Sequence, residues 1–207
     1  MSFNFDYDAK CIISSIDDEI NNKLNNYVNS ITPLIQSDSE NSWLNYVFGL
    51  HNMNEGINYN ILFDKSTLLS ENQKFIINTA YDLLVENGFN VDKNNGLLNI
   101  DIYHIDSAKP VSTKYGSYCN DNDISNVEYD TCVFYTQKDK GVNGDLIIHT
   151  TKPKLLSKDT TQIIKTKSNM VILRNGDCYY DFRPHYGLGK EHIISVHFEK
   201  NNFEHDD

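Results

Sequence analysis

The sequence has no long apolar run, little positive charge and few cysteines, and each shortage excludes a class of protein. No hydrophobic stretch approaches the roughly 20 apolar residues of a membrane-spanning helix, so no membrane segment is expected. The 18 lysines and arginines stand against 29 aspartates and glutamates, and the resulting charge of −11 would repel a phosphate backbone. Nucleic acid is therefore not an expected partner. Residues 1–10 carry acidic side chains and no apolar stretch, which argues against a secretory signal.

The four cysteines, Cys11, Cys119, Cys132 and Cys178, are scattered without a Cys-x-x-Cys pair. This spacing favours neither a zinc site nor a disulfide framework. We expect reduced thiols in an intracellular, cytoplasmic protein, and 207 residues is the size of one domain. Asn, Ile, Lys, Tyr and Asp are abundant, as in proteins from AT-rich genomes such as those of large DNA viruses or some protists. For a viral protein, the compartment would be the host cytoplasm.

The N-terminal part of the sequence has the period of helices. Apolar side chains recur every three or four residues from Ile13 to Ile31, the spacing of one helix face. Pro33 is expected to end that helix, because proline disfavours helical backbone in the residue before it. A shorter helix is expected around residues 43–50. The clearest helix is predicted to begin at Ser70, which opens a capping box, and to stop at Asn87-Gly88.

After Gly96 the period changes to the alternation of strands. Short β-rich runs follow at residues 98–104, 132–135, 146–148, 163–164, 170–173, 178–180 and 193–198. Asn175-Gly176, between two of them, predicts a hairpin turn. Helices followed by short strands indicate an α+β fold. We expect a single domain over residues 1–207, with mainly helical support (1–95), a β-barrel or sandwich core (96–200) and an acidic tail (201–207).

Three segments resemble the prolyl-hydroxylase-like branch of the Fe(II)/2-oxoglutarate dioxygenase superfamily. Residues 131–136 with 142–146 are similar to that family's strand and glycine-acid-leucine turn. Residues 169–176 are similar to the strand and turn before the distal metal histidine, and residues 187–196 to the last barrel strand. The resemblance implies N-terminal helices packed on a double-stranded β-helix, a jelly-roll-like barrel.

The resemblance also implies a site. The family holds Fe(II) with a His-x-Asp/Glu pair and a distant histidine, and an Arg or Lys on the last barrel strand grips the far carboxylate of 2-oxoglutarate. Lys190 opens that strand in this sequence and is the candidate for the carboxylate, with Ser195 lining the same pocket. The alternative interpretation of Lys190 is a surface lysine at a strand start.

The metal positions of this sequence depart from the family pattern. In the better-spaced register, the His-x-Asp pair falls at Cys119 and Asp121. The distal histidine, counted back from Lys190, falls at Tyr180 or Asp181. Tyrosine is a poor Fe(II) ligand at neutral pH because its ordinary pKa is about 10. These departures predict a site without metal and a chain without a cofactor.

A second set of metal ligands stays open. His104-Ile105-Asp106 is a literal His-x-Asp triplet at the end of a predicted strand. With Asp181 or His185 as the distant ligand, it would bind Fe(II). The alternative interpretation of His185 is an exposed loop residue.

Two functions follow from the resemblance, and the catalytic residues are left unassigned. The first is a dioxygenase-fold protein with a decayed iron site that acts as a protein-binding or regulatory module, of viral origin if the composition reflects one. The second is an active Fe(II)/2-oxoglutarate-dependent hydroxylase of a protein or small-molecule substrate. A structural β-sandwich without a ligand is a third. A protein partner is expected, and the oligomeric state is not predicted.

Overall fold

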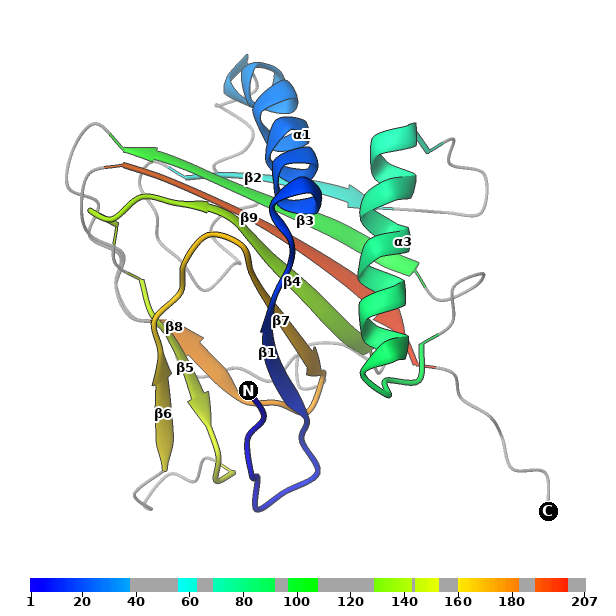
Figure 1. Ribbon diagram of the computed structural model, residues 1–207, viewed down its shortest axis with the longest axis vertical. Helices are drawn as coiled ribbons and strands as arrows, with labels where there is room; N and C mark the ends of the chain where they lie inside the picture. The colour runs from blue at the N-terminus through cyan, green and yellow to red at the C-terminus, as the bar shows by residue number, and fades with distance from the viewer. Residues whose placement is uncertain are drawn as a thin grey trace.

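The computed structural model describes residues 1–37, 56–62, 69–91, 97–107, 129–142, 144–152, 160–182 and 189–200. These residues are mostly β-structure, with two helices (Figure 1). The elements in chain order are β1 (Cys11–Ser15), α1 (Asp18–Ser37), β2 (Gly56–Leu62), α3 (Glu71–Glu86), β3 (Leu97–Ser107), β4 (Tyr129–Lys138), β5 (Leu146–His149), β6 (Thr161–Ile164), β7 (Met170–Asn175), β8 (Tyr180–Phe182) and β9 (Gly189–Glu199). No helix among the described residues is long and apolar enough to cross a membrane.

The strands form two antiparallel sheets. The large sheet has the order β1-β7-β4-β9-β3-β2, and the small sheet has the order β6-β5-β8. The predicted hairpin at Asn175-Gly176 is wrong, because β7 lies in the large sheet and β8 in the small one. The turn is present but carries the chain from one sheet to the other.

The N-terminal part departs from the expected run of helices. Ile13 lies in the edge strand β1, which pairs with β7. Its position in the apolar repeat suits a strand equally well, because Cys11 and Ile13 also alternate. α1 continues through Pro33 to Ser37, so the expected stop at Pro33 is wrong. β2 was not expected, and the helix predicted around residues 43–50 lies outside the described residues.

Side-chain caps fix where the two helices begin. Asp17 Oδ1 accepts a hydrogen bond of 2.8 Å from the Ile20 N–H, which starts α1. The capping box of α3 is confirmed: Gln73 N–H donates to Ser70 Oγ, and Ser70 N–H donates to Gln73 Oε1. The predicted end is confirmed as well, because Gly88 follows α3 with a φ of 73°, a backbone conformation that favours glycine.

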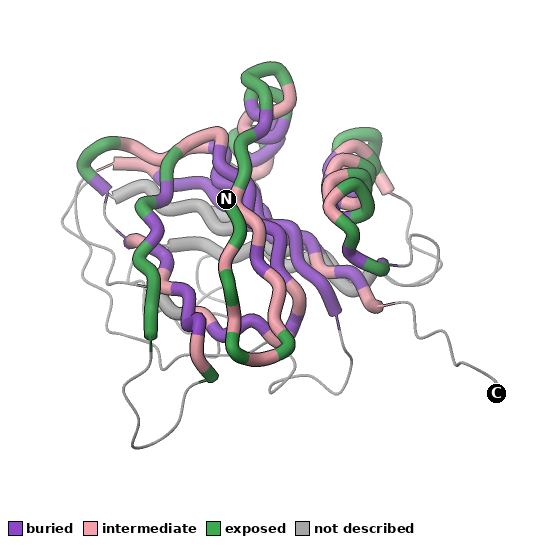
Figure 2. The backbone as a smooth tube through the Cα atoms, turned by 60° about the horizontal axis from the view of Figure 1, so that its bottom comes forward, coloured by how far each residue is buried: buried purple, intermediate pink, exposed green. Residues whose placement is uncertain are grey.

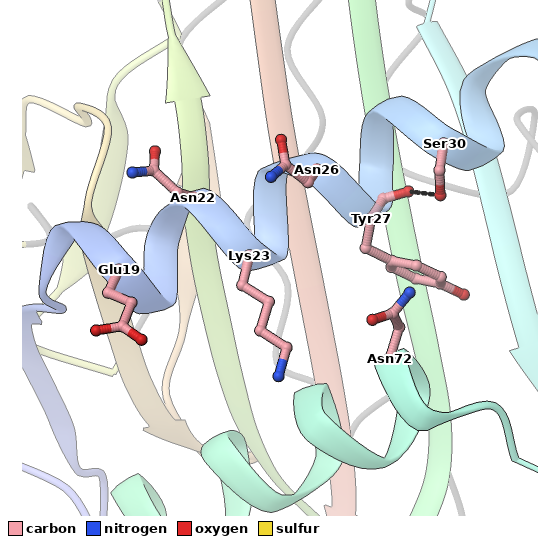
Figure 3. A pocket seen from close by; sticks show the side chains of 7 residues that line it. All are labelled: Glu19, Asn22, Lys23, Asn26, Tyr27, Ser30 and Asn72. Atoms are coloured by element: carbon pink, nitrogen blue, oxygen red, sulfur yellow. Dashed lines mark hydrogen bonds between the residues drawn. The ribbon is translucent and has the colours of Figure 1, made fainter.

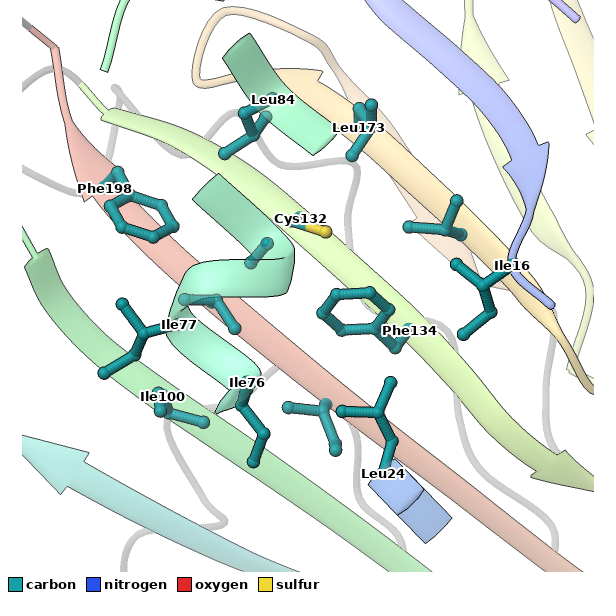
Figure 4. Packing of buried hydrophobic residues seen from close by; sticks show 14 of the residues in the cluster. Ile16, Leu24, Ile76, Ile77, Leu84, Ile100, Cys132, Phe134, Leu173 and Phe198 are labelled. Carbon is teal, nitrogen blue, oxygen red and sulfur yellow. The ribbon is translucent and has the colours of Figure 1, made fainter. Parts of the chain in front are cut away.

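One face of the large sheet, which we call the helix face, packs against α1 and α3 (Figures 1 and 4). Alternate side chains of the central strands meet apolar side chains of both helices there, and all are buried (Figure 2). The members include Leu24, Val28, Ile76, Ala80, Leu84, Ile100, Ile102, Cys132, Phe134, Val171, Leu173, Ile194, Val196 and Phe198. Because strand side chains alternate, the intervening residues point to the opposite face.

The opposite face of the large sheet packs against the small sheet. Their shared cluster, the inter-sheet core, consists of Cys11, Val133, Tyr135, Leu146, Ile148, Ile164, Met170, Ile172, Cys178 and Ile193. Phe3, Phe5 and Ala9 of the N-terminal segment pack against it from outside the sheets. Two of the residues predicted for the site, Tyr180 and Ser195, adjoin this core.

Candidate functional site

The strand register sorts the side chains of the large sheet that point toward the small sheet into rows. Each row runs across β7, β4 and β9, and polar residues gather at the two ends of the face. The rows, in order, are Arg174, Thr131 and His197; then Ile172, Val133 and Ser195; then Met170, Tyr135 and Ile193; and last Lys138 and Glu191. A mostly apolar middle, which also holds Ser195 and Tyr135, therefore separates two polar ends.

A buried ion pair occupies one polar end. Lys138 Nζ lies 3.1 Å from Glu191 Oε1, and their side chains are 5% and 0% exposed. The same ammonium donates to the Gly144 carbonyl at 3.3 Å and to Thr166 Oγ1, which flank β5 and β6 of the small sheet. An ammonium has three N–H donors, and two of them are used in these hydrogen bonds, beside the ion pair with Glu191. Lys138 therefore joins the two sheets.

A β-bulge turns Lys138 inward. Tyr135 pairs with Ile193, but Gln137 pairs with His192, so β4 has one extra residue at this point. Simple alternation counted from Tyr135 would place Lys138, three residues on, on the helix face. Because the bulge leaves Thr136 out of the pairing, Lys138 stands opposite Glu191 between the sheets.

α1 holds the bulge in place from the helix face. Asn21 Nδ2 donates 2.9 Å to the carbonyl of Thr136, the extra residue. Asn25 Oδ1 lies 2.6 Å from His192 Nδ1, and both asparagines come from the same side of α1. His192 is fully buried. Side chains far away in the sequence thus fix the local register at Lys138.

Tyr135 lies beside the ion pair and stays neutral. It is 1% exposed, and burial raises the pKa of its phenol well above the ordinary value. The negative charges of Glu191 and Asp145 raise that pKa further. The phenol therefore supplies a hydroxyl and no negative charge at neutral pH.

Replacing Tyr135 by phenylalanine is expected to make stability less sensitive to alkaline pH. In the unfolded chain this phenol ionises near pH 10, whereas in the folded chain it keeps its proton, so the free energy of unfolding falls as pH rises above about 10. Tyr135→Phe removes about 1.4 kcal/mol of that fall between pH 9 and pH 11. Urea denaturation near pH 9 and near pH 11 measures this fall in the natural chain and in Tyr135→Phe. If the free energy of unfolding falls equally in both, Tyr135 is not a buried neutral phenol.

The two predicted 2-oxoglutarate residues lie on β9 at different faces. Ser195 points between the sheets and is buried, opposite Val133 of β4. Alternation along β9 places Lys190 with His192, on the helix-face side, and its main-chain N–H donates 2.9 Å to Asp139 Oδ2. Glu191, the residue after Lys190, takes the inward position. The role predicted for Lys190 stays a prediction.

Tyr180, the predicted distal position, adjoins the inter-sheet core. It pairs with Ile148 of β5, and its ring packs against the core residues. The guanidinium carbon of Arg174 lies 4.0 Å from the centre of the Tyr180 ring, and Arg174 is 5% exposed. Asp181, the next residue, pairs with Ile147. The structure therefore places a phenol stacked under a permanent positive charge at the predicted distal position.

The other predicted metal positions are not brought together with Tyr180 among the described residues. Cys119, Asp121 and His185 lie outside those residues. His104 and Asp106 lie in β3, opposite His192 and Lys190 of β9, in the large sheet. Within the described ranges, no three His, Cys, Asp or Glu side chains are grouped so that they could hold a metal. All of these metal assignments stay predictions.

A separate groove of about 660 Å³ lies between the helices (Figure 3). Polar residues of α1 from Glu19 to Ser30 line it, together with Asn72 of α3. Lys23 Nζ lies 3.7 Å from the centre of the Phe75 ring, which ties the two helices together. Because α1 and α3 cover the helix face, this groove lies on the other side of the large sheet from Tyr180 and Glu191.

Comparison with known proteins identifies the fold. No family model matches the sequence, and none of the curated proteins matches it either. Among solved structures, a prolyl hydroxylase from Trichoplax adhaerens in complex with a hypoxia-inducible-factor peptide fragment has a TM-score of 0.57 at 11% identity, over 92% of this chain and 83% of that one. A Pseudomonas putida prolyl-4-hydroxylase has a TM-score of 0.53 at 10% identity, over 92% of both chains. The chain has the fold of the prolyl hydroxylases and 2-oxoglutarate–Fe(II) oxygenases, as the sequence resemblance predicted.

The expectation of a chain without a cofactor is wrong for this fold. HygX from Streptomyces hygroscopicus, similar over 94% of this chain and 84% of its own with a TM-score of 0.55 at 11% identity, was solved with nickel, 2-oxoglutarate and hygromycin B bound. Fe(II) and 2-oxoglutarate are the cofactors that the fold implies. Among the described residues, Glu191 points between the sheets near the start of β9, and the guanidinium of Arg174 lies over the ring of Tyr180.

Proposed function

We propose that this chain is a prolyl-hydroxylase-like protein that binds a protein segment and whose iron site is altered. In this proposal the two sheets are the walls of a double-stranded β-helix, and the space between them is the ligand site. The order of strands and the comparisons support the architecture.

The stacking of Arg174 on Tyr180 carries the proposal. The family has an imidazole at the distal position, a neutral nitrogen ligand that suits iron. Here the ring is a phenol, and a guanidinium lies 4.0 Å from its centre. Arginine keeps its charge at any physiological pH, so it would repel a divalent cation bound at this position. The predicted Cys119 in place of the first histidine points the same way.

A protein segment is the proposed partner. The similar Trichoplax adhaerens enzyme was solved with a peptide fragment, so this fold can accommodate an extended segment of another protein. The charge of −11 on the present chain would attract a segment with lysines or arginines and repel an acidic one. We therefore propose a basic, proline-containing segment.

An active Fe(II)/2-oxoglutarate hydroxylase is the second candidate. The observation that favours it is the comparison itself, since the solved structures described above are hydroxylases or carry 2-oxoglutarate. In that case His104 and Asp106, with Asp181 or His185, are the ligands that the sequence offers for iron.

The two candidates predict different products from one assay. The chain is incubated in air with Fe(II), 2-oxoglutarate and synthetic lysine-rich peptides that contain proline, and each peptide is also made with alanine in place of proline. We expect peptides to be retained by the chain, measured by fluorescence polarisation, with no gain of an oxygen atom by mass spectrometry and no succinate. A peptide that gains one oxygen atom at proline would contradict the proposal and establish the second candidate.

A further inference from the structure

We propose that Cys11 and Cys178 are a redox-active pair, whose two thiols are converted by a small disulfide into one disulfide bond between β1 and the turn before β8. The pair is a modification site, and its co-reactant is a disulfide of the class of oxidised glutathione. This inference does not depend on the proposed function, because it uses neither a metal nor a ligand bound between the sheets.

The first support is that the two thiols are in contact. Cys11 and Cys178 are 1% and 0% exposed, and both belong to the inter-sheet core. Each is a free cysteine, and the thiol of Cys11 is the side-chain hydrogen-bond partner of Cys178. A disulfide joins its sulfur atoms at about 2 Å, so two thiols already in contact need only a small movement to reach that distance.

The second support is that hydrogen bonds hold the backbone of both cysteines. Cys11 of β1 pairs with Arg174 of the neighbouring strand β7 (Figure 1). Beside that pair, the Lys10 N–H donates 2.9 Å to Asn175 Oδ1, and the Asn175 N–H donates 3.0 Å to the Lys10 carbonyl. The turn then closes with a bond of 3.1 Å from the Cys178 N–H to the Asn175 carbonyl. Asn175 thus ties the strand that carries one cysteine to the turn that carries the other.

Cys132 provides the internal comparison. It is fully buried as well, but it belongs to the helix face, whereas the pair lies on the other side of the large sheet. Burial raises the pKa of the Cys132 thiol, whereas for Cys178 the contact with Cys11 is the larger cause of a raised pKa. Among the described cysteines, Cys11 and Cys178 are therefore the two that the fold brings together.

The reaction consists of two thiol–disulfide exchanges. The thiolate of one cysteine attacks a sulfur of oxidised glutathione, which forms a mixed disulfide and releases one glutathione thiolate. The thiolate of the other cysteine then attacks the protein sulfur of that mixed disulfide, which forms the Cys11–Cys178 bond and releases the second glutathione thiolate. Two electrons pass from the chain to glutathione, and the two thiol protons end on the two released glutathione molecules.

The pair reacts when β1 opens. The contact with Cys11 and burial raise the pKa of Cys178 well above its ordinary value, so the reactive thiolate is scarce in the closed fold. β1 is the edge strand of the large sheet, next to β7, so it can leave while the central strands stay paired. Once the disulfide has formed, β1 is held in place.

The disulfide would also act on the polar end that holds Arg174 and Tyr180. Cys178 lies two residues before Tyr180, and Cys11 stands opposite Arg174, whose guanidinium stacks on the Tyr180 ring. A bond between the two cysteines therefore fixes the backbone on both sides of this stack.

Equilibration of the natural chain in glutathione buffers, with and without urea, tests the proposal. Each mixture is started from the reduced and from the oxidised chain, free thiols are trapped with N-ethylmaleimide, and unreduced peptides are mapped by mass spectrometry. A bond that stabilises the fold forms more readily in the folded chain by the same factor. We expect half oxidation of the folded chain at a ratio of glutathione disulfide to squared glutathione at least about tenfold lower than in urea.

Urea denaturation gives the second readout. The oxidised natural chain should unfold at a higher urea concentration than the reduced chain. Cys178→Ala should lose this difference, and the control Cys132→Ala should keep it. Circular dichroism under reducing conditions confirms that each variant is folded, and the peptide map of the natural chain needs no variant.

Two results would overturn the proposal. One is a folded chain without the Cys11–Cys178 bond at ratios that oxidise the unfolded chain, whether its thiols stay reduced, carry glutathione or are linked to Cys119 or Cys132. The other is an oxidised chain that unfolds at the same urea concentration as the reduced one. Neither result bears on peptide binding or oxygen transfer, so failure here is distinct from failure of the proposed function.

Discussion

Replacing Lys138 by methionine is expected to lower the free energy of unfolding by about 3–5 kcal/mol, because it removes the ammonium that forms an ion pair with the buried carboxylate of Glu191. Glu191 is fully buried, so solvent cannot compensate for the lost partner. The Gly144 carbonyl and the Thr166 hydroxyl lose a donor in the same substitution. The effect is large because the partners of this ammonium come from β9 and from the segments that adjoin one end of β5 and β6 in the small sheet.

Urea denaturation at neutral pH measures this loss, and two further variants locate its cause. The double variant Lys138→Met/Glu191→Leu should recover most of the stability, because replacing a buried ion pair by apolar residues of similar size is often neutral or stabilising. Lys140→Met, at an exposed position two residues on, should change stability by less than about 0.5 kcal/mol. If the free energy of unfolding falls no more in Lys138→Met than in Lys140→Met, Lys138 does not stabilise the fold through the buried ion pair.

Replacing Phe134 by alanine is expected to lower the free energy of unfolding by about 3–5 kcal/mol. The loss is similar to that of Lys138→Met but has a different cause. Phe134 has no exposed surface and lies at the centre of the helix face, near Leu24 of α1 and Ile76 of α3 (Figure 4). Alanine would leave a cavity beneath both helices. The helices would lose apolar contact without any change in the polar site on the other face.

Chemical denaturation followed by circular dichroism tests the Phe134 variant. The matched control is Val85→Ala on α3, where the side chain is 44% exposed and truncation should cost less than about 0.5 kcal/mol. If Phe134→Ala lowers the free energy of unfolding by less than about 1 kcal/mol, the packing of α1 and α3 on the helix face does not contribute to stability as proposed.

Local signals in the sequence were enough to predict some elements and not their partners. Ser70 and Gln73 define the start of α3 by bonds within four residues, so the helix could be predicted without the rest of the fold. Asn175-Gly176 marks a turn equally well whether the next strand pairs with the last or crosses to another sheet. That difference depends on contacts with β5, which lie far away in the sequence.

The candidate site shows the same limit more sharply. Ser195 and Tyr180 could be placed between the sheets because strand alternation holds around each of them. Lys138 could not, because the bulge reverses the alternation one residue before it. The bond that fixes this bulge comes from Asn21, more than a hundred positions earlier in the chain. Nothing in the residues around Lys138 indicates that contact, so the sequence favoured Lys190.

The measurement that tests the altered iron site most directly is an anaerobic calorimetric titration of the natural chain with 2-oxoglutarate, with and without Mn(II) in place of Fe(II). An intact set of metal ligands would chelate 2-oxoglutarate through the metal and tighten its binding. The altered site predicts the same affinity for 2-oxoglutarate whether or not Mn(II) is present. Binding that becomes at least about tenfold tighter with Mn(II) would contradict the account and show that the chain assembles a metal centre.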